Sequence, residues 1–239
     1  MNRPLILAVE TSGRLGSIAL ALGDDLLAQA SFSAPMRHSA EIFPSIENLL
    51  ARFNRKPSQI EQVYISIGPG SFTGLRIAVT IAKIFNLANS AKIVSVDTLD
   101  LLASNIFDFL ASQTQKPAIE TVAAILDAKR GQFFISTFNI QSSALSKLLP
   151  DSIMTAAQFL EYAAAISKPI YLLGEGLVYY KDKFKAHGIE ILDESFWYPK
   201  AANLHKLGWQ LAQKGHFADP LTFTPNYVMR PDIVPPKVT

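Results

Sequence analysis

Two acidic residues, Glu10 and Asp127, each close a short apolar run with the length of a buried strand, Leu5–Val9 and Val122–Leu126. Carboxylates at strand ends supply the oxygen ligands that could hold a hydrated Mg²⁺ ion beside a nucleotide. The loop after Glu10 lacks a plain glycine pattern for cradling phosphate, and the loop after Asp127 is short and basic. We therefore expect both acids to cap strands or to pair with neighbouring arginines, rather than to support ATP hydrolysis.

A glycine-rich turn, Gly68-Pro69-Gly70-Ser71, separates an apolar run of strand length from a segment with helical spacing. Backbone N–H groups at such a helix start can bind an anion, so Gly68, Gly70 and Ser71 join Glu10 as weak candidates for phosphate binding. The turn itself also needs these residues, because glycine permits unusual backbone angles and Ser71 or Thr73 can cap the helix. We expect a structural role here and no bound cofactor.

The chain contains no cysteine, which excludes disulfides, thiolate catalysis and a cysteine zinc site. It has four histidines, and they form neither a pair at helical spacing nor an HExxH string: His38, His187, His205 and His216. We therefore expect no metal site.

The formal net charge of the 239-residue chain is only +2, which argues against a strong independent hold on nucleic acid. No uncharged apolar run is long enough to span a bilayer, and the N-terminal apolar run is too short for a signal peptide. These features predict a protein of the cytoplasm that does not bind membranes.

The order of predicted elements repeats along the chain. Each half reads strand, strand, strand, helix, strand, helix, strand, helix, which implies two mixed β-sheets flanked by helices. Among these elements we expect strands at Lys92–Val96 and Ile170–Leu173, and helices at 99–110, 152–165 and 177–186. This α/β order resembles the duplicated actin-like ATPase fold, also described as ribonuclease H-like. We expect an N-terminal lobe at 1–110, a C-terminal lobe at 118–216 and a C-terminal tail at 217–239.

Two predicted helices carry more apolar surface than a solvent-facing helix needs. The helix that starts near Ser39 has Ile42, Ile46 and Leu49 on one face. The helix that starts near Thr73 is apolar almost all round and must be buried by something. Packing on the protein's own sheet is one interpretation, and contact with another chain is the other. We predict a partner interface that uses the three residues above together with Gly74, Leu75, Ala78, Ile81, Ala82 and Phe85.

Five stretches together resemble the TsaB family, also called YeaZ, in order along the whole chain. They are Leu7-Ala8-Val9-Glu10-Thr11-Ser12, His38-Ser39-Ala40-Glu41, Gly68-Pro69-Gly70-Ser71-Phe72-Thr73-Gly74-Leu75-Arg76-Ile77, Leu126-Asp127-Ala128-Lys129-Arg130-Gly131 and Tyr227-Val228-Met229-Arg230. The third string is long enough to be specific.

The resemblance implies a non-catalytic subunit of the bacterial machinery that forms N6-threonylcarbamoyladenosine at position 37 of tRNAs that read ANN codons. Its implied partners are the catalytic paralogue TsaD in a heterodimer, the ATPase TsaE and, in the pathway, the threonylcarbamoyl-AMP synthase TsaC. The resemblance also implies a homodimer when the chain is alone, and tRNA bound only within the complex.

An older description of this family as glycoprotease-like is not supported by the residues. The catalytic paralogue carries a metal-binding histidine pair where Thr98 and Leu102 stand here, and neither side chain can replace an imidazole ligand. We expect no catalytic residues. The alternatives are an autonomous ATP-dependent enzyme, a nucleotidase or kinase that uses Glu10 and Asp127, and a metallopeptidase, which the missing pair disfavours.

Overall fold

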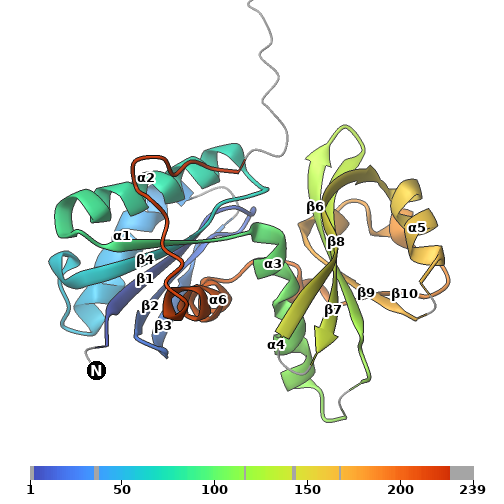
Figure 1. The fold of residues 1–239 in the computed structure, drawn as a ribbon, viewed down its shortest axis with the longest axis horizontal. Coiled ribbons are helices and arrows are strands. Elements are labelled where there is room, and N and C mark those ends of the chain that lie inside the picture. The colour runs from blue at the N-terminus through green and yellow to red at the C-terminus, as the bar shows by residue number, and fades with distance from the viewer. Residues whose placement is uncertain (1–2, 35–37, 116, 142–143, 167, 227–239) are drawn as a thin grey trace, which may run out of the picture.

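The computed structural model describes residues 3–34, 38–115, 117–141, 144–166 and 168–226. The chain forms two five-stranded mixed sheets, each with three antiparallel strands continued by two parallel ones. Each sheet is the centre of one lobe, and the lobes lie side by side (Figure 1). The prediction of two mixed sheets flanked by helices is confirmed.

The first sheet has the strand order β3-β2-β1-β4-β5. Its strands are β1 (Leu5–Glu10), β2 (Ser17–Leu22), β3 (Asp25–Ser31), β4 (Ile60–Ser66) and β5 (Lys92–Val96). All six residues of β1 are buried, because helices cover both faces of this central strand. Helices α1 (His38–Arg52) and α2 (Phe72–Asn89) pack on one face, and α6 (Ala201–Gln213) packs on the other.

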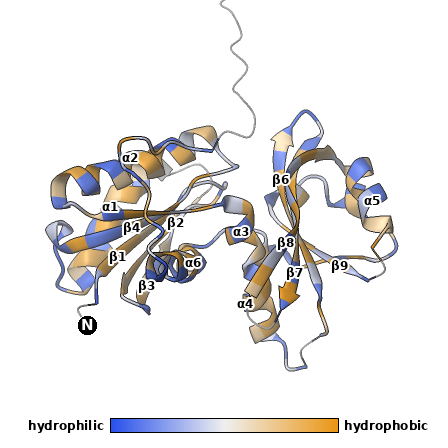
Figure 2. Ribbon diagram, in the orientation of Figure 1, coloured by the Kyte–Doolittle hydropathy of each residue, from blue (hydrophilic) through white to orange (hydrophobic). Residues whose placement is uncertain are grey.

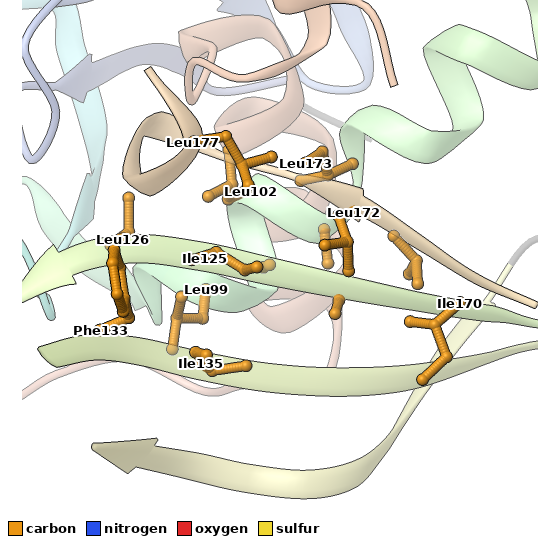
Figure 3. Close-up of a cluster of buried hydrophobic side chains, with 14 of the residues drawn as sticks. Leu99, Leu102, Ile125, Leu126, Phe133, Ile135, Ile170, Leu172, Leu173 and Leu177 are labelled. Atoms are coloured by element: carbon orange, nitrogen blue, oxygen red, sulfur yellow. The ribbon is translucent and has the colours of Figure 1, made fainter. Parts of the chain in front are cut away.

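The second sheet has the strand order β10-β9-β6-β7-β8. Its strands are β6 (Thr121–Lys129), β7 (Gln132–Gln141), β8 (Ala144–Thr155), β9 (Ile170–Leu173) and β10 (Ile189–Ile191). Its core receives side chains from α3 (Thr98–Ala103), α4 (Asn105–Ser112) and α5 (Ala156–Ala164). Figure 3 shows Leu102 of α3 above Ile125, and Leu99 of α3 between Ile125 and Ile135, in this cluster.

The two lobes exchange helices at their boundary. Helix α3 follows the first sheet in the chain but packs on the second, whereas α6 follows the second sheet and packs on the first. A polar network joins the two crossing segments: the Asn203 amide donates to Asn105 Oδ1 at 2.9 Å and to Asp108 Oδ2 at 3.0 Å, and Lys200 also pairs with Asp108. The division into lobes at 1–110 and 118–216 stays a prediction, and this exchange is a feature that it did not include.

Three helical segments differ from expectation. The segment expected as a helix over 177–186 instead forms short 3₁₀ turns, η2 (Glu175–Leu177) and η3 (Lys181–Phe184). The helix expected from Ser152 begins only at Ala156, because β8 continues its pairing with β7 up to Thr155. The helix expected over 99–110 is divided into α3 and α4 at Ser104. Two further 3₁₀ turns are η1 (Pro57–Gln59) and η4 (Glu194–Phe196).

The segment after α6 returns to the first lobe. Ala218 bridges Ile93 of β5, Phe223 is buried in the core under α1 and α2, and the Asn226 N–H donates to Ile67 O at 2.8 Å. Most of the expected tail, 227–239, lies outside the described residues. Within the described part of the chain, no helix is long and apolar enough to cross a membrane.

Candidate functional site

The carboxylate of Glu10 is completely buried at the end of β1. Its Oε1 accepts hydrogen bonds from the Ser12 N–H at 2.6 Å and from the Ser12 hydroxyl at 2.5 Å. Its Oε2 lies near the Ser66 hydroxyl, but neither atom makes a hydrogen bond of ordinary geometry within the described residues. Burial raises the pKa of Glu10 above its ordinary value, and the hydroxyls of Ser12 and Ser66 oppose that rise. A carboxyl that is fully buried and held by its own loop is a poor ligand for a hydrated Mg²⁺ ion.

The second acid, Asp127, has a partner of its own. It accepts hydrogen bonds from the Lys129 N–H at 2.8 Å and from Lys129 Nζ at 3.0 Å. This pairing within one hairpin satisfies a carboxylate that the ATP-dependent alternative would need for a metal ion. The expectation that this acid closes a strand or pairs with an arginine is wrong here: β6 continues to Lys129, and the partner of Asp127 is a lysine.

The glycine-rich turn is bonded to the rest of the first lobe. The Ser71 N–H donates to Ser12 O at 2.7 Å, and the Gly68 N–H donates to Thr98 Oγ1 at 3.1 Å. The Ser71 hydroxyl accepts from the Gly74 N–H at 3.2 Å, so Ser71 is the N-cap of α2. Gly70 lies exposed on the same turn. Two of the backbone donors proposed for phosphate are therefore used inside the protein, and a phosphate role for these residues stays untested.

Close contact between the two loops explains the glycine at the start of α2. A Cβ atom on Gly74 would lie 1.8 Å from the backbone oxygen of Thr11, which is far inside van der Waals contact. The Thr11 hydroxyl donates to the Gly74 carbonyl at 2.7 Å. The Gly74 position therefore lets α2 begin directly against the loop that follows β1.

The positions aligned with the paralogue's metal ligands serve the fold. Thr98 is buried and accepts the hydrogen bond from Gly68, and Leu102 is buried in the core of the second lobe. His205 is buried on α6, where its Nε2 lies 2.8 Å from Gly23 O and its ring stacks on Tyr64. The described residues contain no group of three or more histidines, cysteines or carboxylates that could hold a metal ion. The side chain of His38 lies outside what the structure describes.

The residues expected at a partner interface are core residues in the single chain. All nine are buried, with at most 9% of their surface exposed, and they pack between α1, α2 and the first sheet: Ile42, Ile46, Leu49, Gly74, Leu75, Ala78, Ile81, Ala82 and Phe85. A direct role for them in binding a partner stays a prediction. In this structure the nine residues hold α1 and α2 against the sheet, and any partner would contact the outer faces of these helices instead.

The outer faces of α1 and α2 carry apolar side chains that the sequence reasoning missed. Eight large hydrophobic residues are exposed among those described, and four of them lie on these two helices: Phe43, Phe72, Ile84 and Leu87. Leu87 is 89% exposed. Figure 2 shows apolar stretches along α2. The available signal was the spacing of Ile84 and Leu87 by three residues, on a side of α2 away from the small residues Gly74, Ala78 and Ala82.

The comparisons with known proteins point to one family. The family model "TsaD: tRNA N6-adenosine threonylcarbamoyltransferase" matches residues 33–220. The tRNA threonylcarbamoyladenosine biosynthesis protein TsaB of Bacillus subtilis is 30% identical over 171 residues, which are 71% of this chain and 70% of that protein. The protein of the same name from Escherichia coli is 24% identical over 218 residues, covering 88% of each chain.

A solved structure has the same fold. YeaZ from Pseudomonas aeruginosa superposes with a TM-score of 0.79 at 21% identity, covering 94% of this chain and all of that one. The similarity shows that the two chains share this fold of two mixed sheets.

Proposed function

Because the chain belongs to the TsaB family of tRNA threonylcarbamoyladenosine biosynthesis proteins, we propose that it is a non-catalytic subunit required to form N6-threonylcarbamoyladenosine at position 37 of tRNA. In this role it binds the catalytic paralogue TsaD and supports it. The observation that carries the proposal is the exposed apolar surface on α1 and α2, in a chain whose candidate catalytic groups are bonded internally.

The outer surface of the two helices is suited to pairing with a second helix pair. α1 and α2 pack beside each other on one face of the first sheet, so their outer faces form one continuous side of the lobe (Figure 1). Phe43, Ile84 and Leu87 would leave water in the complex, and the burial of apolar area drives association at about 25 cal/mol per Å². Arg76, whose guanidinium lies 3.7 Å above the Phe72 ring, would place a charge at the start of α2.

The paralogue is expected to offer an equivalent helix pair, because the family model that matches this chain is the one named for TsaD. Two helices from each chain would then form a four-helix interface. A homodimer through the same surface would form when the chain is alone, and the two assemblies would compete. TsaE and tRNA would join only the heteromeric complex.

The alternative, an autonomous nucleotidase or kinase, receives less support from the site. Glu10 is buried and held by Ser12, Asp127 is paired with Lys129, and two donors of the glycine-rich turn are bonded to Ser12 and Thr98. Calorimetry of the isolated chain with ATP and Mg²⁺ would distinguish the two functions, because tight binding with turnover would favour the enzyme.

Replacing Ile84 by Glu tests the docking surface directly. Ile84 is 49% exposed, so the folded monomer should tolerate a glutamate at this position. In the complex, the same carboxylate would be buried in an apolar interface without a partner, which is strongly unfavourable. We expect Ile84→Glu to lower capture of the TsaD paralogue at least tenfold in a pulldown and to abolish its support of tRNA modification. Ala78, which is fully buried, is unsuitable for this test because a charge there would disturb the core.

Leu148→Glu is the matched control. Leu148 is 52% exposed and lies on β8 in the other lobe, so it receives the same charge at the same exposure away from the helices. Both variants should keep the circular dichroism spectrum of the parent. Equal capture of the paralogue by both variants would contradict the proposed surface.

A further inference from the structure

One carboxylate joins the two lobes across a sequence separation of 161 residues. Glu175 lies in η2, directly after β9 of the second sheet, and Arg14 lies in the loop between β1 and β2 of the first. The Arg14 N–H donates to both oxygens of Glu175, at 2.9 Å to Oε1 and 2.8 Å to Oε2. The contact is therefore held by the backbone of one lobe and a side chain of the other.

The local sequence lets the lobes approach closely at this contact. A Cβ atom on Gly13 would lie 2.2 Å from Glu175 Oε1, so a side chain at this position would displace the carboxylate from its present place. The Arg14 guanidinium adds a second bond between the lobes: its Nη1 donates to the Tyr179 hydroxyl at 2.8 Å, and its carbon lies 5.0 Å from the centre of that ring. Glu175 and Tyr179 thus engage one residue of the opposite lobe.

This contact differs in chemistry from the network at the helix crossing. The amides of Asn203 and Asn105 are neutral at every physiological pH, and Lys200 and Asp108 form an ion pair there. Glu175 instead is a carboxyl group that loses most of its water when the lobes are together. Its charge state must therefore affect how readily they separate.

We propose that the Glu175–Arg14 contact is a pH-dependent latch, which holds the lobes together under mildly acidic conditions and lets them separate as the pH rises through neutrality.

The charged groups around Glu175 affect its pKa. Burial raises its pKa from 4.5 to about 7, the nearby Glu10 adds to the rise, and the Arg14 N–H, the Arg14 charge and the Lys129 charge oppose it. Tyr198 also lies within electrostatic range, and the negative charge of Glu175 helps to raise the pKa of that phenol. Burial exceeds the opposing contributions because the closed lobes exclude water from the carboxylate.

The direction of the effect follows from linkage. The closed form binds the Glu175 proton more tightly than an open, hydrated form would, so protonation favours closure and ionisation favours opening. With pKa values of about 7 when closed and 4.5 when open, the ratio of open to closed molecules rises about 30-fold between pH 5.5 and pH 8. The bond to the Arg14 N–H survives protonation, because the remaining carbonyl oxygen still accepts it.

Hydrogen exchange at the Arg14 amide measures the open fraction. After division by the intrinsic exchange rate at each pH, protection of this amide should fall about 30-fold from pH 5.5 to pH 8. The Ser71 amide, which donates to Ser12 O within the first lobe, should show no such change and reports on local unfolding. Equal protection of Arg14 at both pH values, or a parallel loss at Ser71, would overturn the latch.

Two variants isolate the carboxyl group. Glu175→Gln cannot ionise, so protection at Arg14 should become independent of pH, while Glu190→Gln removes an equal charge from an exposed position of the same lobe and should behave as the parent. Gly13→Ala places a methyl group against Glu175 Oε1 and should expose the Arg14 amide at every pH. Persistent pH dependence in Glu175→Gln, or full protection in Gly13→Ala, would refute the proposal.

The distance between the lobes distinguishes separation from a swing of the side chain alone. The chain has no cysteine, so nitroxides can be attached after Ser58→Cys and Glu161→Cys, two exposed positions on different lobes. Dilution with unlabelled protein keeps the labels in single chains of any dimer. Pulsed dipolar spectroscopy should show longer distances at pH 8 than at pH 5.5 in the parent and no change in Glu175→Gln. Identical distributions in the parent would reject lobe separation.

Discussion

Replacing Gly74 by Ala should have two effects of opposite sign on stability: a gain from helix propensity and a loss from crowding at the start of α2. Alanine is more favourable than glycine in a helix by about 1 kcal/mol, so the sequence of the helix alone predicts a gain in stability. In the structure, the added Cβ would lie 1.8 Å from the Thr11 backbone oxygen, and it would also lie 3.3 Å from the Ser71 side chain. The obstacle is backbone of a buried loop, not the end of a flexible side chain.

The magnitudes favour packing. Overpacking of a tight site costs about 1–3 kcal/mol, and displacement of Thr11 would also strain its bond to the Gly74 carbonyl, worth about 1 kcal/mol. After the propensity gain is subtracted, we expect Gly74→Ala to lower the free energy of unfolding by about 1–3 kcal/mol. In a chain of this size that corresponds to a fall of about 3–10 °C in the melting temperature.

Urea denaturation followed by circular dichroism measures the change, with Thr80→Ala as control. Thr80 is exposed on the outer face of the same helix, so alanine there should produce only the propensity gain of a few tenths of a kcal/mol. If Gly74→Ala were as stable as the parent, or more stable, the close contact between α2 and the Thr11 loop would be wrong.

The remaining predictions concern the buried side chains of the first lobe. Phe223→Ala should cost about 3–5 kcal/mol in chemical denaturation, because the ring is buried under α1 and α2 and its loss leaves a cavity; a cost below about 1 kcal/mol would contradict its placement. Burial lowers the pKa of His205 below 6.5, so the stability linked to this ring is present above that value and is lost as the pH falls through the lowered pKa. Between pH 7 and pH 5, the denaturation midpoint of His205→Gln should fall less than that of the parent. Equal falls would mean that another group causes the loss of stability in acid.

The two pH effects of this protein have opposite signs. The raised pKa of Glu175 stabilises the folded state toward acid, and this contribution is lost as the pH rises through about 7. The lowered pKa of His205 acts in the other direction. A pH profile of the parent alone therefore mixes both, and the variants are needed to separate them.

The sequence alone determined the two-sheet architecture and most of the order of elements. The segments Ile170–Leu173 and Lys92–Val96 have the bounds of the observed strands, because most of their residues are buried in the sheets and must therefore be apolar. The sequence also limited the cap of α2 to Ser71 or Thr73, because the N–H groups at a helix start need a side-chain acceptor within reach; the structure shows that Ser71 is the cap. Local chemistry also disfavoured a histidine metal site.

Only the tertiary structure decided which face of α1 and α2 is inside. Periodicity identifies an apolar stripe, but it cannot say whether a sheet of the same chain or another protein covers it. The small residues Gly74 and Ala78 pack toward the first sheet, and Ile84 and Leu87 remain outside. The contact between Glu175 and Arg14 was equally invisible, because the folding of two lobes brings together residues that are 161 positions apart and removes the water that sets the charge of a carboxyl group.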